Sequence, residues 1–245
     1  MRIGEATSST VTEVWSQVQT GAPQPKYVED VAQRLVTALH SQFDESIVIA
    51  RVFVTVPFGE LPAVIQSAVR KLAESAKAGS QLKADTPVLS LVGTHGQEQD
   101  WRDRRQSKGH AGIPLVSSSF VGAIPMISRL LRELGVPLEW VDSHDAQMVI
   151  ETIGSATGLF FVDNAAEATD QQGRKIIAAQ DFVSKYSVRS VFGMGGAYSG
   201  GEIIVIVLFC RDGIPRAAAE RFLGLTELFK SKTAHLVASK KVFTS

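Results

Sequence analysis

The feature that most constrains the fold is a pair of strand-like segments near the end of the chain, separated by a short glycine-rich turn. The first, VRSVFGM, covers residues 188–194, and the second, EIIVIVLFC, covers residues 202–210. Runs of β-branched and apolar residues of this kind are typical of buried strands. Two strands joined by so short a turn run antiparallel, so we expect a mainly antiparallel sheet.

Further strands and helices are predicted along the rest of the chain. Strand-like segments occupy residues 46–56, 86–95 and 158–163. Apolar residues recur at helical spacing over residues 11–18, 27–39, 60–77, 124–135 and 176–186. A single long terminal helix is predicted over 214–242. This mixture predicts an α+β fold, in which a central antiparallel β-sheet is flanked by N- and C-terminal helices.

Two prolines in the stretch GAPQP, at residues 21–25, interrupt the chain between its first two predicted helices. We therefore expect residues 1–26 to form an N-terminal helix and linker. Residues 27–245 have the length and apolar content of one domain with a sizeable core.

The charge balance and the cysteine content restrict the class of protein. Lysine plus arginine equals aspartate plus glutamate, at 25 each. Proteins that act by neutralising phosphates usually carry a basic excess, so nucleic acid is not an expected partner. The apolar runs are too short for a membrane span, and no signal peptide is recognisable. With Cys210 as the single cysteine, no internal disulfide can form, and we expect a cytoplasmic protein that does not bind a membrane.

The stretch WRDRRQSKGHAGIPL, residues 101–115, is called the basic segment below. It concentrates donors that suit a carboxylate or phosphate ligand. The candidate ligand-binding residues are Trp101, Arg102, Arg104, Arg105, Ser107 and His110. The alternative is a structural loop whose arginines pair with the local acids Glu98, Asp100 and Asp103. The spacing alone favours neither interpretation.

Other motifs point away from familiar chemistry. The glycines of GMGGAYSGG lie between two strands, which favours a hairpin turn over a phosphate-binding loop. The histidines lack the spacing of a helical metal site, so no metal is predicted. No Gly-x-Ser-x-Gly nucleophile motif occurs. Cys210 ends an apolar strand, and we expect it to be buried, unreactive and without a catalytic role.

Two blocks of the sequence resemble the GAF-like sensory modules of bacterial two-component signalling proteins, including hybrid histidine kinases. In the first block the matching residues are Trp101, Arg104 or Arg105, Ser107, Gly109, His110, Ile113, Pro114 and Leu115, then Pro125, Met126 and Ile127. In the second they are residues 188–191, 203–209 and 214–216. The resemblance covers about residues 27–237.

The resemblance implies a GAF/PAS-like sheet of about five or six strands, with the terminal helices on one face and a ligand pocket on the other. It also implies a non-catalytic sensor of an unidentified small molecule. No kinase or receiver domain follows the last helix, so we expect output through a separate partner, such as a histidine kinase, or through self-association. GAF-like modules bind ligands as different as cyclic nucleotides, tetrapyrroles, haem and metabolites, so the cofactor stays unknown.

Two other classes of function remain open, an enzyme on the same scaffold and a purely structural interaction protein. Some GAF-like proteins reduce free methionine sulfoxide with one nucleophilic and further resolving cysteines. Cys210 alone cannot complete that intramolecular disulfide step.

A homodimer through the terminal helices is the expected oligomeric state. The stripe of Val11, Val14, Trp15 and Val18, together with apolar positions such as Leu228, exceeds what one helix on one sheet can bury. The alternative is that both stripes pack within one chain. We also expect Arg104→Ala with Arg105→Ala to abolish ligand binding and leave the fold intact, since exposed charges contribute little stability.

Overall fold

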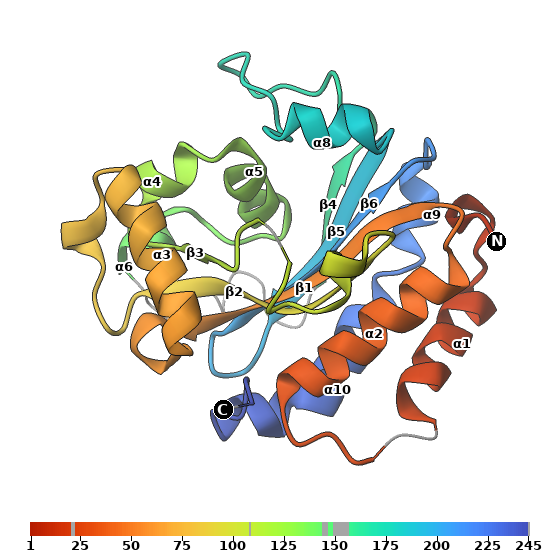
Figure 1. The fold of residues 1–245 in the computed structure, drawn as a ribbon, viewed down its shortest axis with the longest axis horizontal. Coiled ribbons are helices and arrows are strands. Elements are labelled where there is room, and N and C mark those ends of the chain that lie inside the picture. The colour runs from red at the N-terminus through yellow and green to blue at the C-terminus, as the bar shows by residue number, and fades with distance from the viewer. Residues whose placement is uncertain (21–22, 108, 144–146, 149–156, 245) are drawn as a thin grey trace.

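The computed structural model describes residues 1–20, 23–107, 109–143, 147–148 and 157–244, and its centre is one antiparallel sheet (Figure 1). The strands are β1 (Ile47–Pro57), β2 (Pro87–Gly96), β3 (Gly112–Pro114), β4 (Gly158–Val162), β5 (Ser190–Ala197) and β6 (Ile203–Cys210). Their order across the sheet is β3-β2-β1-β6-β5-β4, and every neighbouring pair is antiparallel. The predicted α+β fold is therefore confirmed.

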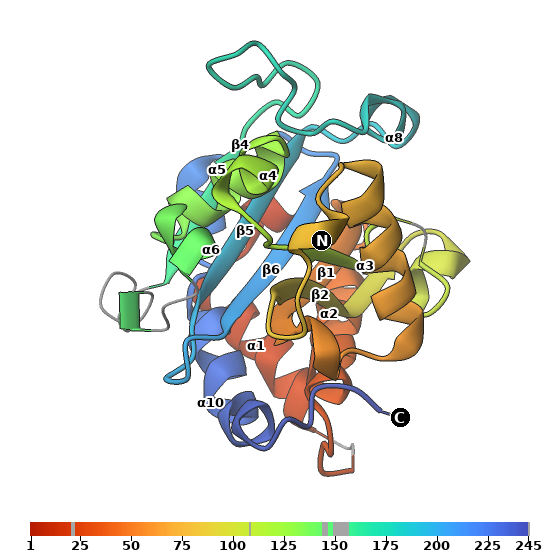
Figure 2. The ribbon, with the colours of Figure 1, turned by 90° about the vertical axis from the view of Figure 1, so that its left-hand side faces the viewer.

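Helices cover both faces of the sheet. They are α1 (Ser8–Gln19), α2 (Val28–Gln42), α3 (Ala63–Ser75), α4 (Ser118–Gly122), α5 (Pro125–Glu133), α6 (Glu139–Ser143), α8 (Gln180–Lys185), α9 (Arg216–Glu220) and α10 (Gly224–Ala238). Short 3₁₀ turns are η1 (Ile3–Glu5), η2 (Phe58–Glu60), η3 (Gly79–Gln81) and η4 (Gln99–Arg102). Figure 2 shows α3, α4, α5 and α6 in front of the sheet, with α1, α2 and α10 behind it.

The terminal helices form one packed layer against the sheet. In α2 the carboxylate of Asp30 accepts the backbone N–H of Tyr27 at 3.0 Å, which satisfies a free donor at the helix start. The apolar side of α2 approaches β2 so closely that a Cβ on Gly93 would lie 2.7 Å from the backbone of Ala32. Glycine at position 93 is therefore required for this contact between helix and sheet.

Alternation along the central strands separates two apolar cores. Ala50, Val52 and Val54 of β1 point into the core beneath α1, α2 and α10. The intervening residues Ile49 and Phe53 face the opposite layer. The same alternation occurs in β6, so both middle strands are covered on both faces, as their nearly continuous apolar sequences require.

The long terminal helix predicted over 214–242 is wrong, because the structure has two helices there. The first, α9, ends at Glu220 and the second, α10, begins at Gly224. Phe222 lies in the break and is fully buried, with its ring 5.6 Å from that of Phe43 and 5.7 Å from that of Phe192. Placing this side chain in the core and the low helix propensity of glycine both favour a break at this point.

The two apolar stripes that suggested a dimer pack within this chain. Val14 and Trp15 of α1 are buried in the same core as Leu225 and Phe229 of α10, and both helices contact α2. This is the alternative weighed against the dimer in the sequence. Leu228 of α10 keeps 40% of its surface exposed.

The other predicted helices and strands agree with the structure apart from boundaries and short elements. The glycine-rich turn is a β5–β6 hairpin, closed by a hydrogen bond from Tyr198 N to Glu202 O at 2.8 Å. Cys210 is buried on the face of β6 that is covered by α1, α2 and α10. Burial raises the pKa of its thiol well above the usual range. Strand β3 and helices α4 and α6 were not predicted. The helix predicted over 176–186 is shortened to α8.

Candidate functional site

A cavity of about 340 Å³, called the sheet cavity, lies on the face of the sheet opposite α2. Its floor is formed by residues of β1, β2 and β6, and its walls by α5, α8 and the loops before them. The lining residues are Ile49, Arg51, Phe53, Leu89, Trp101, Gly109, His110, Ile113, Ile124, Pro125, Met126, Ile127, Leu130, Ile176, Ile177, Ala178, Ala179, Phe182, Val205, Val207 and Phe209. Such a concave, mainly apolar cavity with few polar groups is typical of small-molecule sites.

Arg51 supplies a positive charge to this apolar cavity from the middle of β1. Burial lowers the pKa of its guanidinium to about 10, so the side chain remains protonated at neutral pH. Its Nη2 donates to the hydroxyl of Ser107 at 3.2 Å. The sequence reasoning missed Arg51. A charged residue within the apolar strand segment SIVIARVFVTV was the signal that would have found it.

The part of the basic segment around Gly109 lies beside the guanidinium of Arg51. Gly109 has φ +121°, and a Cβ placed there would lie 3.4 Å from the guanidinium Nη1 of Arg51. His110 lines the cavity beside it while its ring remains accessible to solvent. Burial, and secondly the charge of Arg51, lower the pKa of the His110 imidazole. Lys108, between these residues, lies outside the described part of the chain.

An aromatic wall closes one side of the sheet cavity. Trp101, in η4, is buried, and its ring centroid lies 4.8 Å from that of Tyr186 and 5.8 Å from that of Phe182. Phe182 also contacts Phe209 of β6 edge-on at 5.6 Å. Ala178 and Ala179 line the cavity but are exposed, so the opening lies beside them.

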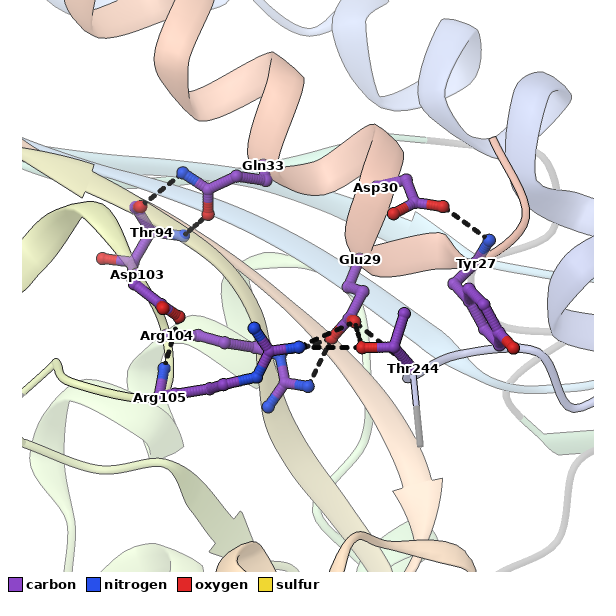
Figure 3. Close-up of polar contacts among 9 residues, drawn as sticks. All are labelled: Tyr27, Glu29, Asp30, Gln33, Thr94, Asp103, Arg104, Arg105 and Thr244. Carbon is purple, nitrogen blue, oxygen red and sulfur yellow. Dashed lines mark hydrogen bonds and ion pairs between the residues drawn. The ribbon is translucent and has the colours of Figure 1, made fainter. Parts of the chain in front are cut away.

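The arginines predicted as ligand-binding residues lie outside the lining of the sheet cavity. Arg104 forms an ion pair and a hydrogen bond with Glu29 at the start of α2, and its guanidinium lies 4.7 Å from the centre of the Phe243 ring. Arg105 Nη2 donates to Thr244 Oγ1 at 2.8 Å and lies 3.7 Å from the Glu29 carboxylate. Figure 3 shows these residues, called the Glu29 cluster: Glu29, Arg104, Arg105 and Thr244.

Thr244 of the C-terminal segment and the backbone of the basic segment complete this cluster. Thr244 donates both its backbone N–H, at 2.9 Å, and its hydroxyl to Glu29. Asp103 accepts the backbone N–H of Arg105 at 2.9 Å, as the dashed line in Figure 3 marks. The local acid therefore shapes the loop, while the side chains of Arg104 and Arg105 pair with a glutamate about 75 residues away in sequence.

The expectation that Arg104 is an exposed charge is wrong. Its side chain is 11% exposed and that of Glu29 is 9% exposed, whereas Arg105 is 59% exposed. Removing one member of a buried ion pair leaves the other charge without compensation, which is costly. Arg102 is exposed, and its backbone carbonyl accepts from the side chain of Gln33 at 3.2 Å. Gln33 also bonds both backbone groups of Thr94 (Figure 3).

Of the six predicted site residues, the structure brings Trp101 and His110 to the sheet cavity and Ser107 to Arg51. Within the described ranges, no group of three or more metal-ligating side chains occurs. His144 lies outside those ranges. No helix in the same ranges is both long and apolar enough to cross a membrane.

Comparisons with known proteins give matches of structure only. No protein-family model and no curated protein sequence matches the chain. The GAF domain of a phosphoenolpyruvate-protein phosphotransferase from Acinetobacter is 11% identical, with a TM-score of 0.48 and 96% of each chain covered. The phycocyanobilin-bound GAF domain of a cyanobacterial phytochrome is 8% identical, with a TM-score of 0.48, covering 96% of this chain and 98% of that one. At these values the likeness assigns neither a family nor a ligand.

Proposed function

We propose that this protein is a non-catalytic, GAF-like regulatory module, in which a small molecule in the sheet cavity changes the contacts of the terminal segments. The observation that carries the proposal is that the basic segment contacts both the sheet cavity and the terminal segments. Trp101, Gly109 and His110 line the cavity, and Arg104 and Arg105 between them bind α2 and the C-terminal segment.

The geometry supports a short physical route for the signal. Six residues lie between Gln106 and Ile113, and this stretch connects the Glu29 cluster to the cavity wall. A ligand shifts such an equilibrium only if it contacts the two arrangements of the segment differently. Direct contact of the ligand with Trp101, Gly109 or His110 supplies that difference. A shift of the segment then changes the Glu29 cluster, and with it the hydrogen bond from Thr244 of the C-terminal segment.

The composition of the lining favours binding over catalysis. Among the described lining residues there is no serine, threonine, cysteine, lysine or acidic side chain to serve as a nucleophile. Cys210 lies on the other face of the sheet, in the core beneath α1, α2 and α10. We therefore prefer the sensor to the sulfoxide-reducing enzyme, with output to a separate signalling partner, such as a histidine kinase, or to a second copy of the chain.

Obstruction of the cavity opening tests the proposal. Ala178 is exposed and lines the cavity, so Ala178→Trp should block entry without disturbing the core. The matched control is Ala166→Trp, an exposed position of the same loop that does not line the cavity. The probes are 2-naphthoate and its neutral amide, 2-naphthamide, measured by calorimetry and thermal unfolding.

We expect at least one probe to bind the wild type and the control but not Ala178→Trp. At about 100 times the Kd, binding adds ~2.7 kcal/mol to the free energy of unfolding, which for a chain of this size raises the Tm by roughly 5–10 °C. Failure of both probes to bind the wild type, or equal binding by Ala178→Trp, would contradict a ligand site in this cavity.

A further inference from the structure

We propose that the sheet cavity selects a singly charged carboxylate carried on an apolar body, and that Arg51 is the residue that binds the carboxylate. The inference rests on the proposed function, in that it takes the cavity to be a ligand site. It adds the chemical class of the ligand and the residue that recognises it.

The position of Arg51 is the first argument. It lies between Ile49 and Phe53 on the cavity-facing side of β1, a strand paired on both edges by β2 and β6. A charge in mainly apolar surroundings loses hydration, and this loss lowers the pKa of Arg51. An anion in the cavity would offset that cost with charge-assisted hydrogen bonds, and the planar guanidinium fork matches the two oxygens of a carboxylate.

The surroundings of the guanidinium are the second argument. Gly109 presents only backbone to it, and any side chain at that position would begin 3.4 Å from Nη1. The left-handed φ of +121° at this residue also favours glycine. Ser107 holds Nη2 from the same segment. The basic segment thus orients the Arg51 head through Ser107, and Gly109 places no side chain against it.

The charges of the described lining residues favour a ligand with one negative charge. Among the described lining residues, Arg51 and His110 are the only side chains that can be ionised, and neither is acidic. His110 has a lowered pKa, so it is largely neutral at pH 7 and offers a hydrogen bond rather than a charge. A phosphate monoester carries between one and two charges at this pH, and its second charge would have no counterpart among the described lining residues. A monocarboxylate matches the single cation.

The rest of the lining describes the body of the ligand. Side chains of Phe53, Trp101, Phe182 and Phe209 surround the cavity together with isoleucines and valines of the sheet and α5. These walls offer dispersion and ring-edge contacts to a flat or branched apolar group. The carboxylate would lie at Arg51, and the apolar body would fill the rest of the cavity, whose whole volume is about 340 Å³.

A matched pair of probes tests the inference. 2-Naphthoate and 2-naphthamide have nearly the same shape and differ in charge, and calorimetry at pH 7 gives the ratio of their affinities. We expect the wild type to bind the acid about tenfold more tightly or better, as the loss of a charge-assisted hydrogen bond implies. Equal affinities in the wild type would overturn the inference but leave the proposed function standing, whereas no binding of either would overturn the proposed function.

Variants of Arg51 assign the preference to one residue. Arg51→Met keeps an unbranched side chain without the charge, and the acid-to-amide ratio should fall to about one, while Arg51→Lys should keep part of it. Arg2→Met removes the same charge from an exposed position outside the cavity and should leave the ratio unchanged. An unchanged ratio in Arg51→Met would overturn the assignment. If Arg51→Met does not fold, Arg51→Lys and the wild-type ratio still decide.

Discussion

At the scale of single residues, Glu29 connects three parts of the chain that are far apart in sequence. Its carboxylate accepts from Arg104 of the basic segment and from Thr244 near the C-terminus, and it forms an ion pair with Arg105 at 3.7 Å. Because Glu29 is buried and bonded to several groups, we expect the cluster to contribute to stability as well as to the proposed signal.

The two arginines of the cluster should differ sharply in their contributions to stability. Arg104→Ala leaves the nearly buried Glu29 without its closest cation and removes the contact with the Phe243 ring, so we expect a loss of ~3 kcal/mol. Arg105 is 59% exposed, and Arg105→Ala should cost less than about 1 kcal/mol. Urea unfolding of both variants measures the difference. Equal losses would show that the Glu29–Arg104 pair is not the buried contact described above.

At the scale of elements, α2 and β2 meet through a pair of histidines. The rings of His40 and His95 lie 4.9 Å apart, and Thr37 Oγ1 lies 3.2 Å from His95 Nδ1. Burial, then His40 and Arg102, lower the pKa of His95 to about 4. Burial, then Arg102 and Arg211, lower that of His40, while Asp44 acts against them. Both rings are therefore neutral in the folded protein at pH 7.

The free energy of unfolding should decrease as the pH falls from about 7 towards 4. In the unfolded chain these histidines take up protons near pH 6.5, whereas in the folded state His95 resists protonation until about pH 4 and the pKa of His40 is also lowered, so acid favours unfolding across this window. Urea unfolding at pH 7 and pH 5 measures the loss. The variant His40→Gln with His95→Gln should reduce it, and His235→Gln, at an exposed position of α10, should not. A loss as large in the double variant as in the wild type would refute this source of acid sensitivity.

The long elements were predictable from sequence because each carries its own apolar period. β1, β2, β6, α1 and α2 all lie within a few residues of their predicted bounds. The three residues of β3 contain no such period, and pairing with β2 alone makes them a strand. The break before α10 also depends on tertiary contacts, because Phe222 enters the core there.

The candidate site was predictable only in part for the same reason. The basic segment was found because its composition is local, and it does border the sheet cavity at Trp101 and His110. The role of its arginines could not be predicted, because their partner Glu29 lies on a helix far away in sequence. Arg51 was missed although it carries a local signal, a single charge within an apolar strand.

At the scale of the whole molecule, the homodimer stays a prediction, and fewer exposed apolar residues now support it. The stripes on α1 and α10 are buried within one chain, and Leu228 is what remains exposed on α10. The prediction is a particle of twice 26.4 kDa by light scattering that dissociates in Leu228→Glu. Val64→Glu, at an 80% exposed position on α3, is the control and should not dissociate it. A wild-type particle of 26.4 kDa would rule out this interface.

The central claim is that a ligand in the sheet cavity changes the contacts of the C-terminal segment through the basic segment. Amide hydrogen exchange of the wild type, with and without saturating 2-naphthoate, tests it most directly. We expect altered exchange both in residues 98–111 and in residues 239–244, which include the Thr244 N–H bonded to Glu29. Protection confined to the cavity lining, with unchanged exchange in residues 239–244, would contradict it.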